Sequence, residues 1–144
     1  MLRIGFVDHY LDEWHANNYP RFIREAAAQM GLEAQVTMAY AECDRPDDKQ
    51  GMTSREWSEA QGIPLAASLE ELSAACDGVM VMAPSFPHRH YDMARPALEM
   101  GKPVYVDKIF APSEEEGGRI FQLAARHGAP LFSTSALRFD ASLD

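Results

Sequence analysis

Short runs of apolar residues alternate with longer stretches of helical periodicity along this 144-residue chain. Apolar runs of about four to eight residues between polar segments are typical of strands buried on both faces of a parallel sheet. The runs that fit are 2–7, 34–40, 63–66, 78–83, 103–106 and 130–133. The pattern therefore predicts six strands with helices between them.

Capping signals mark the helices between these runs. A Ser or Thr followed three residues later by a Glu forms a capping box, which satisfies free backbone N–H groups at a helix start. The pairs with this spacing are Thr53 with Glu56, Ser68 with Glu71, and Ser113 with Glu116. A further helix is expected over 91–100, and the glycines at 101 and 128 suit the ends of the last two helices.

The first helix is predicted from a proline and an apolar stripe. Proline suits the first position of a helix because the N–H that it lacks would have no partner there, so Pro20 is expected to open this helix. The stripe comprises Phe22, Ile23, Ala26, Ala27 and Met30. Strands that alternate with helices through short connections favour an α/β fold. We expect a doubly wound, mainly parallel sheet with helices on both faces, in a single Rossmann-like domain over 1–144.

Charge and cysteine content narrow the environment and the partners. The formal net charge is −9, whereas nucleic acids and anionic membrane surfaces attract Lys- and Arg-rich patches, so neither is expected as a partner. Cys43 and Cys76 have no metal-like spacing, which favours a reduced, cytoplasmic setting. No apolar run approaches the roughly 20 residues of a membrane span.

Several motifs in the second half occur in an order that resembles a known family. An apolar strand ends at Met82-Ala83-Pro84 and is followed by His88. The stretch ALEMGKPV then leads to Asp107-Lys108-Ile109, and an Arg138-Phe139 pair comes near the end. This order resembles the nucleotide-binding domain of the Gfo/Idh/MocA oxidoreductases.

The resemblance implies an NAD(P)-dependent oxidoreductase that acts on a sugar or polyol as its small-molecule substrate. It implies that Lys108 and His88 lie nearest the chemistry. The candidate cofactor-binding residues are Asp8, His9, Tyr10, Glu13, Glu42, Pro84 and Asp107. The family's C-terminal substrate and oligomerisation domain is absent from this chain, so we expect the chain alone to be inactive. The resemblance leaves a homo-oligomer open.

The first loop departs from the family pattern. The positions of the family's Gly-x-Gly-x-x-Gly are occupied by Asp8, Tyr10 and Glu13. A dinucleotide pyrophosphate needs close backbone approach and the free N–H groups of a helix start. Two carboxylates there would repel it by about a kcal/mol or more. We therefore expect that NAD(P) does not bind through this loop in the usual way.

Histidines and carboxylates are expected to meet at the switch point of the sheet, where ligands bind in such folds. The ends of the first and fourth predicted strands should place Asp8, His9 and His15 opposite His88 and His90. Such a crevice suits a polyol, whose hydroxyls hydrogen-bond these groups, or zinc or iron, but no residue is assigned as a metal ligand. The alternative function is a non-redox Rossmann-like domain whose degenerate cofactor loop binds a small polar ligand, a metal or a protein partner.

Lys108 has two interpretations of similar weight. A lysine at the end of a buried strand is costly unless it is paired, so Asp107, Asp8 or a ligand is expected to pair with it. A structural salt bridge and a ligand contact are both open.

Overall fold

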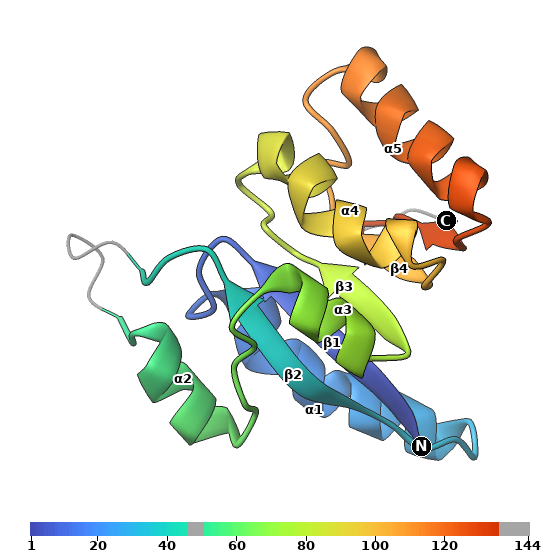
Figure 1. The fold of residues 1–144 in the computed structure, drawn as a ribbon. Coiled ribbons are helices and arrows are strands. Elements are labelled where there is room, and N and C mark those ends of the chain that lie inside the picture. The colour runs from blue at the N-terminus through green and yellow to red at the C-terminus, as the bar shows by residue number, and fades with distance from the viewer. Residues whose placement is uncertain (46–50, 136–144) are drawn as a thin grey trace, which may run out of the picture.

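The computed structural model describes residues 1–45 and 51–135, which build one parallel sheet in the strand order β2-β1-β3-β4-β5 (Figure 1). The strands are β1 (Leu2–Asp8), β2 (Ala34–Ala41), β3 (Gly78–Val81), β4 (Val104–Val106) and β5 (Leu131–Phe132). Every pairing between them is parallel. The predicted α/β class and the pairing of the strands at 2–7 and 78–83 are therefore confirmed, while the Arg138-Phe139 pair lies outside the described residues.

The strand predicted over 63–66 is wrong. This segment makes a single parallel bridge, between Ala39 and Leu65, beside the edge strand β2. The Ala39 N–H donates to the Pro64 carbonyl, and the Ala66 N–H donates to the Ala39 carbonyl. Pro64 has no N–H with which to continue a ladder. Its neighbours Ile63 and Ala66 are buried in the core, which explains the apolar run.

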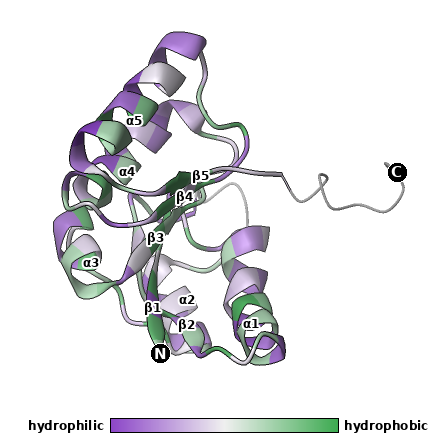
Figure 2. Ribbon diagram, turned by 90° about the vertical axis from the view of Figure 1, so that its right-hand side faces the viewer, coloured by the Kyte–Doolittle hydropathy of each residue, from purple (hydrophilic) through white to green (hydrophobic). Residues whose placement is uncertain are grey.

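Helices cover both faces of the sheet (Figure 2). The helices α1 (Trp14–Gln29) and α2 (Ser54–Gln61) lie on one face, where Trp57 of α2 packs against Phe6 and is fully buried. On the other face, α3 (Leu69–Ala75), α4 (His90–Glu99) and α5 (Glu114–His127) pack over residues such as Val7 and Val81. A short 3₁₀ turn, η1 (Pro87–Arg89), precedes α4. None of the described helices is long and apolar enough to cross a membrane.

The predicted caps of the later helices are confirmed. Thr53 and Glu56 form a complete capping box at α2. The side chains of Ser68 and Ser113 accept hydrogen bonds from the N–H groups of Glu71 and Glu116. Gly128 ends α5 in the left-handed conformation (φ 63°), which glycine adopts without a Cβ penalty.

The first helix begins six residues earlier than predicted. It starts at Trp14, and Pro20 lies inside it rather than at its first position. The expected stripe is only partly right: Ala27 is buried and Ile23 packs against the core, whereas Phe22 and Met30 are 37% and 72% exposed. The buried positions of α1 are Ala16, Pro20 and Ala27. Glu13 caps the helix and moves its start to the very end of the first loop.

Candidate functional site

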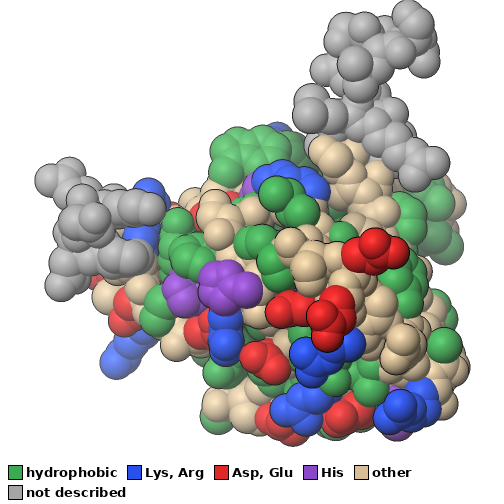
Figure 3. Space-filling model, turned by 90° about the horizontal axis from the view of Figure 1, so that it is seen from above, with side chains coloured by type: hydrophobic (Ala, Val, Ile, Leu, Met, Phe, Trp, Pro, Cys, Tyr) green, Lys and Arg blue, Asp and Glu red, His purple; other side chains and the backbone are tan. Residues whose placement is uncertain are grey.

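The carboxyl ends of β1, β2 and β3 bring polar side chains from distant parts of the sequence together. The face seen in Figure 3 shows histidine side chains beside acidic and hydrophobic ones. Two groups of side chains can be distinguished. We call Asp8, Glu13, His15 and Asp107 the cap cluster, because they surround the start of α1. We call His9, Glu42, Cys43 and Arg89 the β2-end cluster.

Asp8 is a deeply buried carboxylate of the cap cluster. It ends β1 and is only 2% exposed. The His9 N–H donates to its Oδ1 at 2.7 Å, whereas its Oδ2 is buried without a hydrogen-bond partner among the described residues. Burial, and then the negative charge of Glu13, raise the pKa of Asp8 well above its usual range.

Glu13 fills the N-terminus of α1. Its Oε1 accepts the Ala16 N–H at 2.6 Å, and its Oε2 lies 2.7 Å from His15 Nδ1. Burial alone would raise the pKa of Glu13, but the hydrogen bonds from His15 and Ala16 outweigh it and lower that pKa. The backbone N–H groups that would receive a phosphate in this fold already face a carboxylate of the chain itself.

His15 links the start of α1 to the end of β4. Its Nε2 lies 3.6 Å from Asp107 Oδ2, and its Nδ1 faces Glu13. Asp107 is 2% exposed, and its Oδ1 accepts the Tyr105 hydroxyl at 2.9 Å. Burial, and then the Asp107 carboxylate, raise the pKa of Tyr105. The His15 imidazole therefore lies between two carboxylates, those of Glu13 and Asp107.

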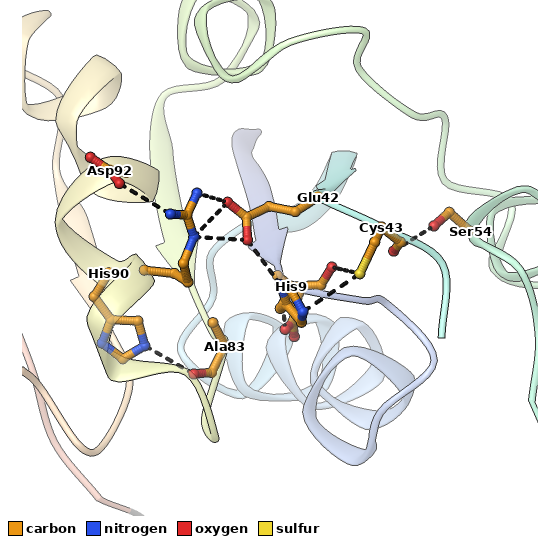
Figure 4. Close-up of polar contacts among 9 residues, drawn as sticks. His9, Glu42, Cys43, Ser54, Ala83, His90 and Asp92 are labelled. Carbon is orange, nitrogen blue, oxygen red and sulfur yellow. Dashed lines mark hydrogen bonds and ion pairs between the residues drawn. The ribbon is translucent and has the colours of Figure 1, made fainter. Parts of the chain in front are cut away.

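The β2-end cluster is an ordered chain of contacts (Figure 4). His9 Nδ1 lies 2.9 Å from Glu42 Oε2, and the exposed Cys43 has its Sγ 3.6 Å from His9 Nε2. Arg89 donates from Nε to both oxygens of Glu42, at 3.0 and 3.2 Å. Burial would raise the pKa of Glu42, but the hydrogen bonds from Arg89 and His9 outweigh it and lower that pKa.

Aromatic rings pack beside the β2-end cluster. The ring of Phe86, in the loop after β3, lies 4.0 Å from the His9 ring between centroids. Phe86 also contacts the rings of Tyr10 and the exposed His88, at 6.2 and 6.1 Å. The rings of His9 and His88 therefore both adjoin the ring of Phe86.

His90 does not belong to the crevice. It is fully buried, and its ring nitrogens face the carbonyls of Met82, Ala83 and Phe110 at 3.0 to 3.2 Å. The prediction that it faces Asp8 is therefore wrong. In a His-x-His pair at the start of a helix, the two side chains point apart, so His88 lies at the surface and His90 in the core.

Lys108 is exposed, and the described residues include no ion-pair partner for it. A salt bridge with Asp107 or Asp8, one of the two interpretations left open for Lys108, is therefore not formed in the described part of the chain. The strand ends at Val106 and Asp107 is the buried residue, so the chain turns outward before the lysine. Pro84 is half-buried in the loop that follows β3.

The cap cluster places acidic side chains where a dinucleotide pyrophosphate lies in this fold. Glu13 occupies the N–H group of Ala16, and Asp8 and Asp107 add carboxylates to the same place. At the ribose position after β2, Glu42 is a suitable residue type but is engaged by Arg89 and His9. Over 1–45 and 51–135, no group of three or more His, Cys, Asp or Glu side chains is arranged to hold a metal ion.

Arg89 and Cys43 were not predicted as site residues. Arg89 lies 47 positions from Glu42 in sequence, and no local pattern reveals such a pairing. Its position in the loop after β3, at the ligand-binding edge of an α/β sheet, is the signal that points to it. Cys43 adjoins Glu42, which was a candidate, and the same edge argument applies to it.

The five-stranded parallel sheet with helices on both faces defines the class of doubly wound, Rossmann-like α/β domains. Within that class, the chain belongs to the Gfo/Idh/MocA oxidoreductase family with an NAD-binding Rossmann fold, whose model matches residues 26–135. The resemblance expected from the second half of the sequence is thereby confirmed.

Solved structures of similar fold include an NAD-binding protein, a dehydrogenase and a reductase. They include an NAD-binding protein from Listeria innocua (TM-score 0.74, 20% identity, 98% of this chain and 37% of that chain). The WlbA dehydrogenase from Bordetella pertussis, in complex with NADH and UDP-GlcNAcA, has a TM-score of 0.71 and 22% identity over 99% of this chain and 40% of its own. Biliverdin reductase from Synechocystis sp. PCC 6803, with biliverdin and NADP+, has a TM-score of 0.64 and 20% identity over 92% and 37%. The chain thus spans well under half the length of these proteins.

Proposed function

We propose that this domain keeps the fold of its family but uses the carboxyl edge of the sheet to bind a small polyhydroxy ligand, a sugar or polyol, in place of NAD(P) in the usual mode. The observation that carries the proposal is the Glu13 carboxylate on the Ala16 N–H. Because the chain supplies its own anion to the start of α1, a phosphate there must displace Glu13 and approach Asp8 as well.

The accessible groups at this edge suit hydroxyl ligands. Lys108 and His88 are exposed, and His9 is half-buried beside Phe86. An ammonium group, an imidazole and nearby carboxylates donate and accept hydrogen bonds at fixed points, which is how a polyol is recognised. The aromatic ring of Phe86 supplies an apolar surface for the carbon face of a sugar ring.

A second candidate function is an NAD(P)-dependent oxidoreductase that acts on a sugar or polyol. The family match over 26–135 supports it, and so does the acidic Glu42 after β2. It requires that the first loop rearranges and releases the α1 N-terminus from Glu13.

Calorimetric titration distinguishes the two functions. The purified chain is titrated with NADH, with NADPH and with myo-inositol as the polyol probe. We expect NAD(P)H to bind more weakly than roughly 10 µM, which corresponds to about −7 kcal/mol. Saturable binding of the polyol that is weakened by Lys108→Met supports the proposal. Binding of either dinucleotide tighter than this limit overturns it and favours the oxidoreductase.

A further inference from the structure

Cys43, directly after β2, is an exposed thiol beside an oriented imidazole. Its Sγ lies 3.6 Å from His9 Nε2 and 3.4 Å from the His9 carbonyl oxygen. On the other side of the ring, Nδ1 lies 2.9 Å from Glu42 Oε2. Because a carboxylate only accepts hydrogen bonds, the neutral ring carries its proton on Nδ1 and presents an unprotonated Nε2 to the sulfur. Figure 4 shows this sequence of contacts.

Two further contacts hold the imidazole and its carboxylate in place. Arg89 donates to both oxygens of Glu42, so the carboxylate is fixed from the side opposite His9. The Phe86 ring packs on the His9 ring, with 4.0 Å between centroids. A nucleophile, a base within hydrogen-bond reach and a third group that orients the base are the parts of an activated nucleophile.

We propose that Cys43, His9 and Glu42 form a thiol–imidazole–carboxylate site at which Cys43 is modified by small disulfides that are uncharged or positively charged. The inference goes beyond the proposed polyol function and does not rest on it. His9 is the base, Glu42 is the positioning residue for the ring, and the disulfide is the oxidant.

The exchange balances without another reactant. His9 Nε2 takes the thiol proton while Cys43 Sγ attacks one sulfur of the disulfide. A new S–S bond forms to Cys43, the original S–S bond breaks, and the departing thiolate takes the proton from the imidazolium. The disulfide is reduced to one free thiol, and Cys43 is oxidised to a mixed disulfide.

The surrounding charges explain both the need for a base and the choice of ligand. Burial, and then the negative charges of Glu42, Asp44 and Asp8, raise the pKa of Cys43. The resting group is therefore a neutral thiol, which reacts only when its proton is removed. The same carboxylates repel an anionic disulfide and attract a cationic one.

The test measures mixed-disulfide formation at Cys43 by intact-protein mass spectrometry at pH 7. The probes are cystamine (cationic), 2-hydroxyethyl disulfide (uncharged) and glutathione disulfide (anionic), each also timed against N-acetylcysteine as a free thiol. The control Cys43→Ser should not react, because the remaining Cys76 is buried. We expect the preference for cystamine over glutathione disulfide to exceed that of the free thiol at least about tenfold, which equals about 1.4 kcal/mol.

Two variants separate activation by His9 from simple electrostatics. His9→Gln should slow the reaction of 2-hydroxyethyl disulfide at least about tenfold. This threshold is conservative, because the loss of a general base typically slows a reaction by about a hundredfold or more. For Glu42→Gln, the direction of the change in reaction rate distinguishes the two explanations. If Glu42 orients His9, the reaction slows; if Glu42 acts on the thiol only as a negative charge, its neutralisation lowers the pKa of Cys43 and the reaction quickens. A faster Glu42→Gln protein overturns the proposal.

The pH dependence of the reaction rate can be measured on the wild-type protein. This test needs no variant, so misfolding of a variant cannot affect it. Base assistance by His9 predicts that the reaction proceeds well below the pH at which an ordinary thiol ionises, about 8.5. A rate that rises only through the ionisation of the thiol itself, above about pH 8.5, would contradict activation by His9.

Discussion

The Glu13 carboxylate accepts the backbone N–H of Ala16 at 2.6 Å and so fills the N-terminus of α1 with the chain's own negative charge. A second hydrogen bond, from His15, holds the carboxylate in that position. In most folds of this kind, the same N–H groups face a ligand phosphate. The contact therefore stabilises the helix and closes the phosphate position at once.

Glu13→Ala should destabilise the protein by about 1 kcal/mol, since this is the typical cost of losing an N-cap side chain. Chemical denaturation measures the change. The matched control is Glu25→Ala, which removes an exposed glutamate in the same helix and a surface ion pair with Arg21. That pair contributes at most a few tenths of a kcal/mol. Equal losses in the two variants would show that Glu13 does not act as a cap.

Asp8→Asn should change the pH dependence of stability. The raised pKa of Asp8 means that the folded protein binds a proton that the unfolded chain has released, so stability falls as the pH rises from about 4 through the folded pKa. Asparagine cannot ionise, so the variant should lack this fall. Between about pH 4 and pH 8, its free energy of unfolding should therefore decrease less than that of the wild type.

Asp12→Asn provides the comparison of opposite sign. Asp12 is buried, but the hydrogen bonds from Asn17, Met52 and Arg45 outweigh burial and lower its pKa. Its contribution to stability is present above about pH 4 and is lost as the pH falls through the folded pKa. Urea denaturation at about pH 2, 3, 4, 6 and 8 covers both ranges, because the Asp12 contribution is lost below about pH 4 and the Asp8 contribution above it. Identical pH profiles for the two variants would contradict the opposite environments of these carboxyl groups.

His90→Ala should cost about 2–4 kcal/mol, because it opens a cavity and removes the imidazole that faces the buried carbonyls of Met82, Ala83 and Phe110. The control is His88→Ala, two residues away at the surface, which should change stability by less than about 0.5 kcal/mol. Thermal or chemical unfolding of both proteins tests the division of roles. A large loss in His88→Ala would contradict the placement of the two histidines.

Most of the fold follows from local signals in the sequence. The capping boxes at Thr53, Ser68 and Ser113 act within one helical turn, so short-range pattern suffices to find them. The segment at 63–66 shows where local signals fail. Its residues Ile63 and Ala66 are buried, but Pro64 prevents a ladder of hydrogen bonds. In the sequence, a buried segment without strand pairing has the same apolar pattern as a buried strand.

The start of α1 was missed because Pro20 suits a first helical position, whereas the local cap that sets the start is a glutamate, Glu13, rather than the usual Ser, Thr, Asp or Asn. His15 binds Glu13 and also faces Asp107, which lies far along the chain at the end of β4. The candidate site could likewise be predicted only in part. Asp8, His9 and Glu42 follow from the rule that ligands bind at the carboxyl ends of parallel strands. The Arg89–Glu42 pair depends on the folded distance between two loops and has no local signature.

A substitution of Lys108, just after the carboxyl end of β4, distinguishes a ligand-binding role from a structural one. The side chain is exposed, and Asp107 beside it is engaged by Tyr105 and faces His15 instead. Lys108→Met should therefore leave the free energy of unfolding within about 0.5 kcal/mol of the wild type, since it removes no buried charge pair. A loss of about 3–5 kcal/mol would point to a broken buried ion pair and contradict this.

The same variant should lose polyol affinity if Lys108 donates to a ligand hydroxyl. A charged donor contributes about 1.5–3 kcal/mol, so the dissociation constant for myo-inositol should rise at least about tenfold. Lys102→Met is the matched control, because Lys102 donates to the Cys76 carbonyl near the opposite ends of the strands and is remote from the site. Calorimetry on both variants measures the change. If the affinity falls equally in Lys102→Met, or remains unchanged in Lys108→Met, then Lys108 does not bind the polyol.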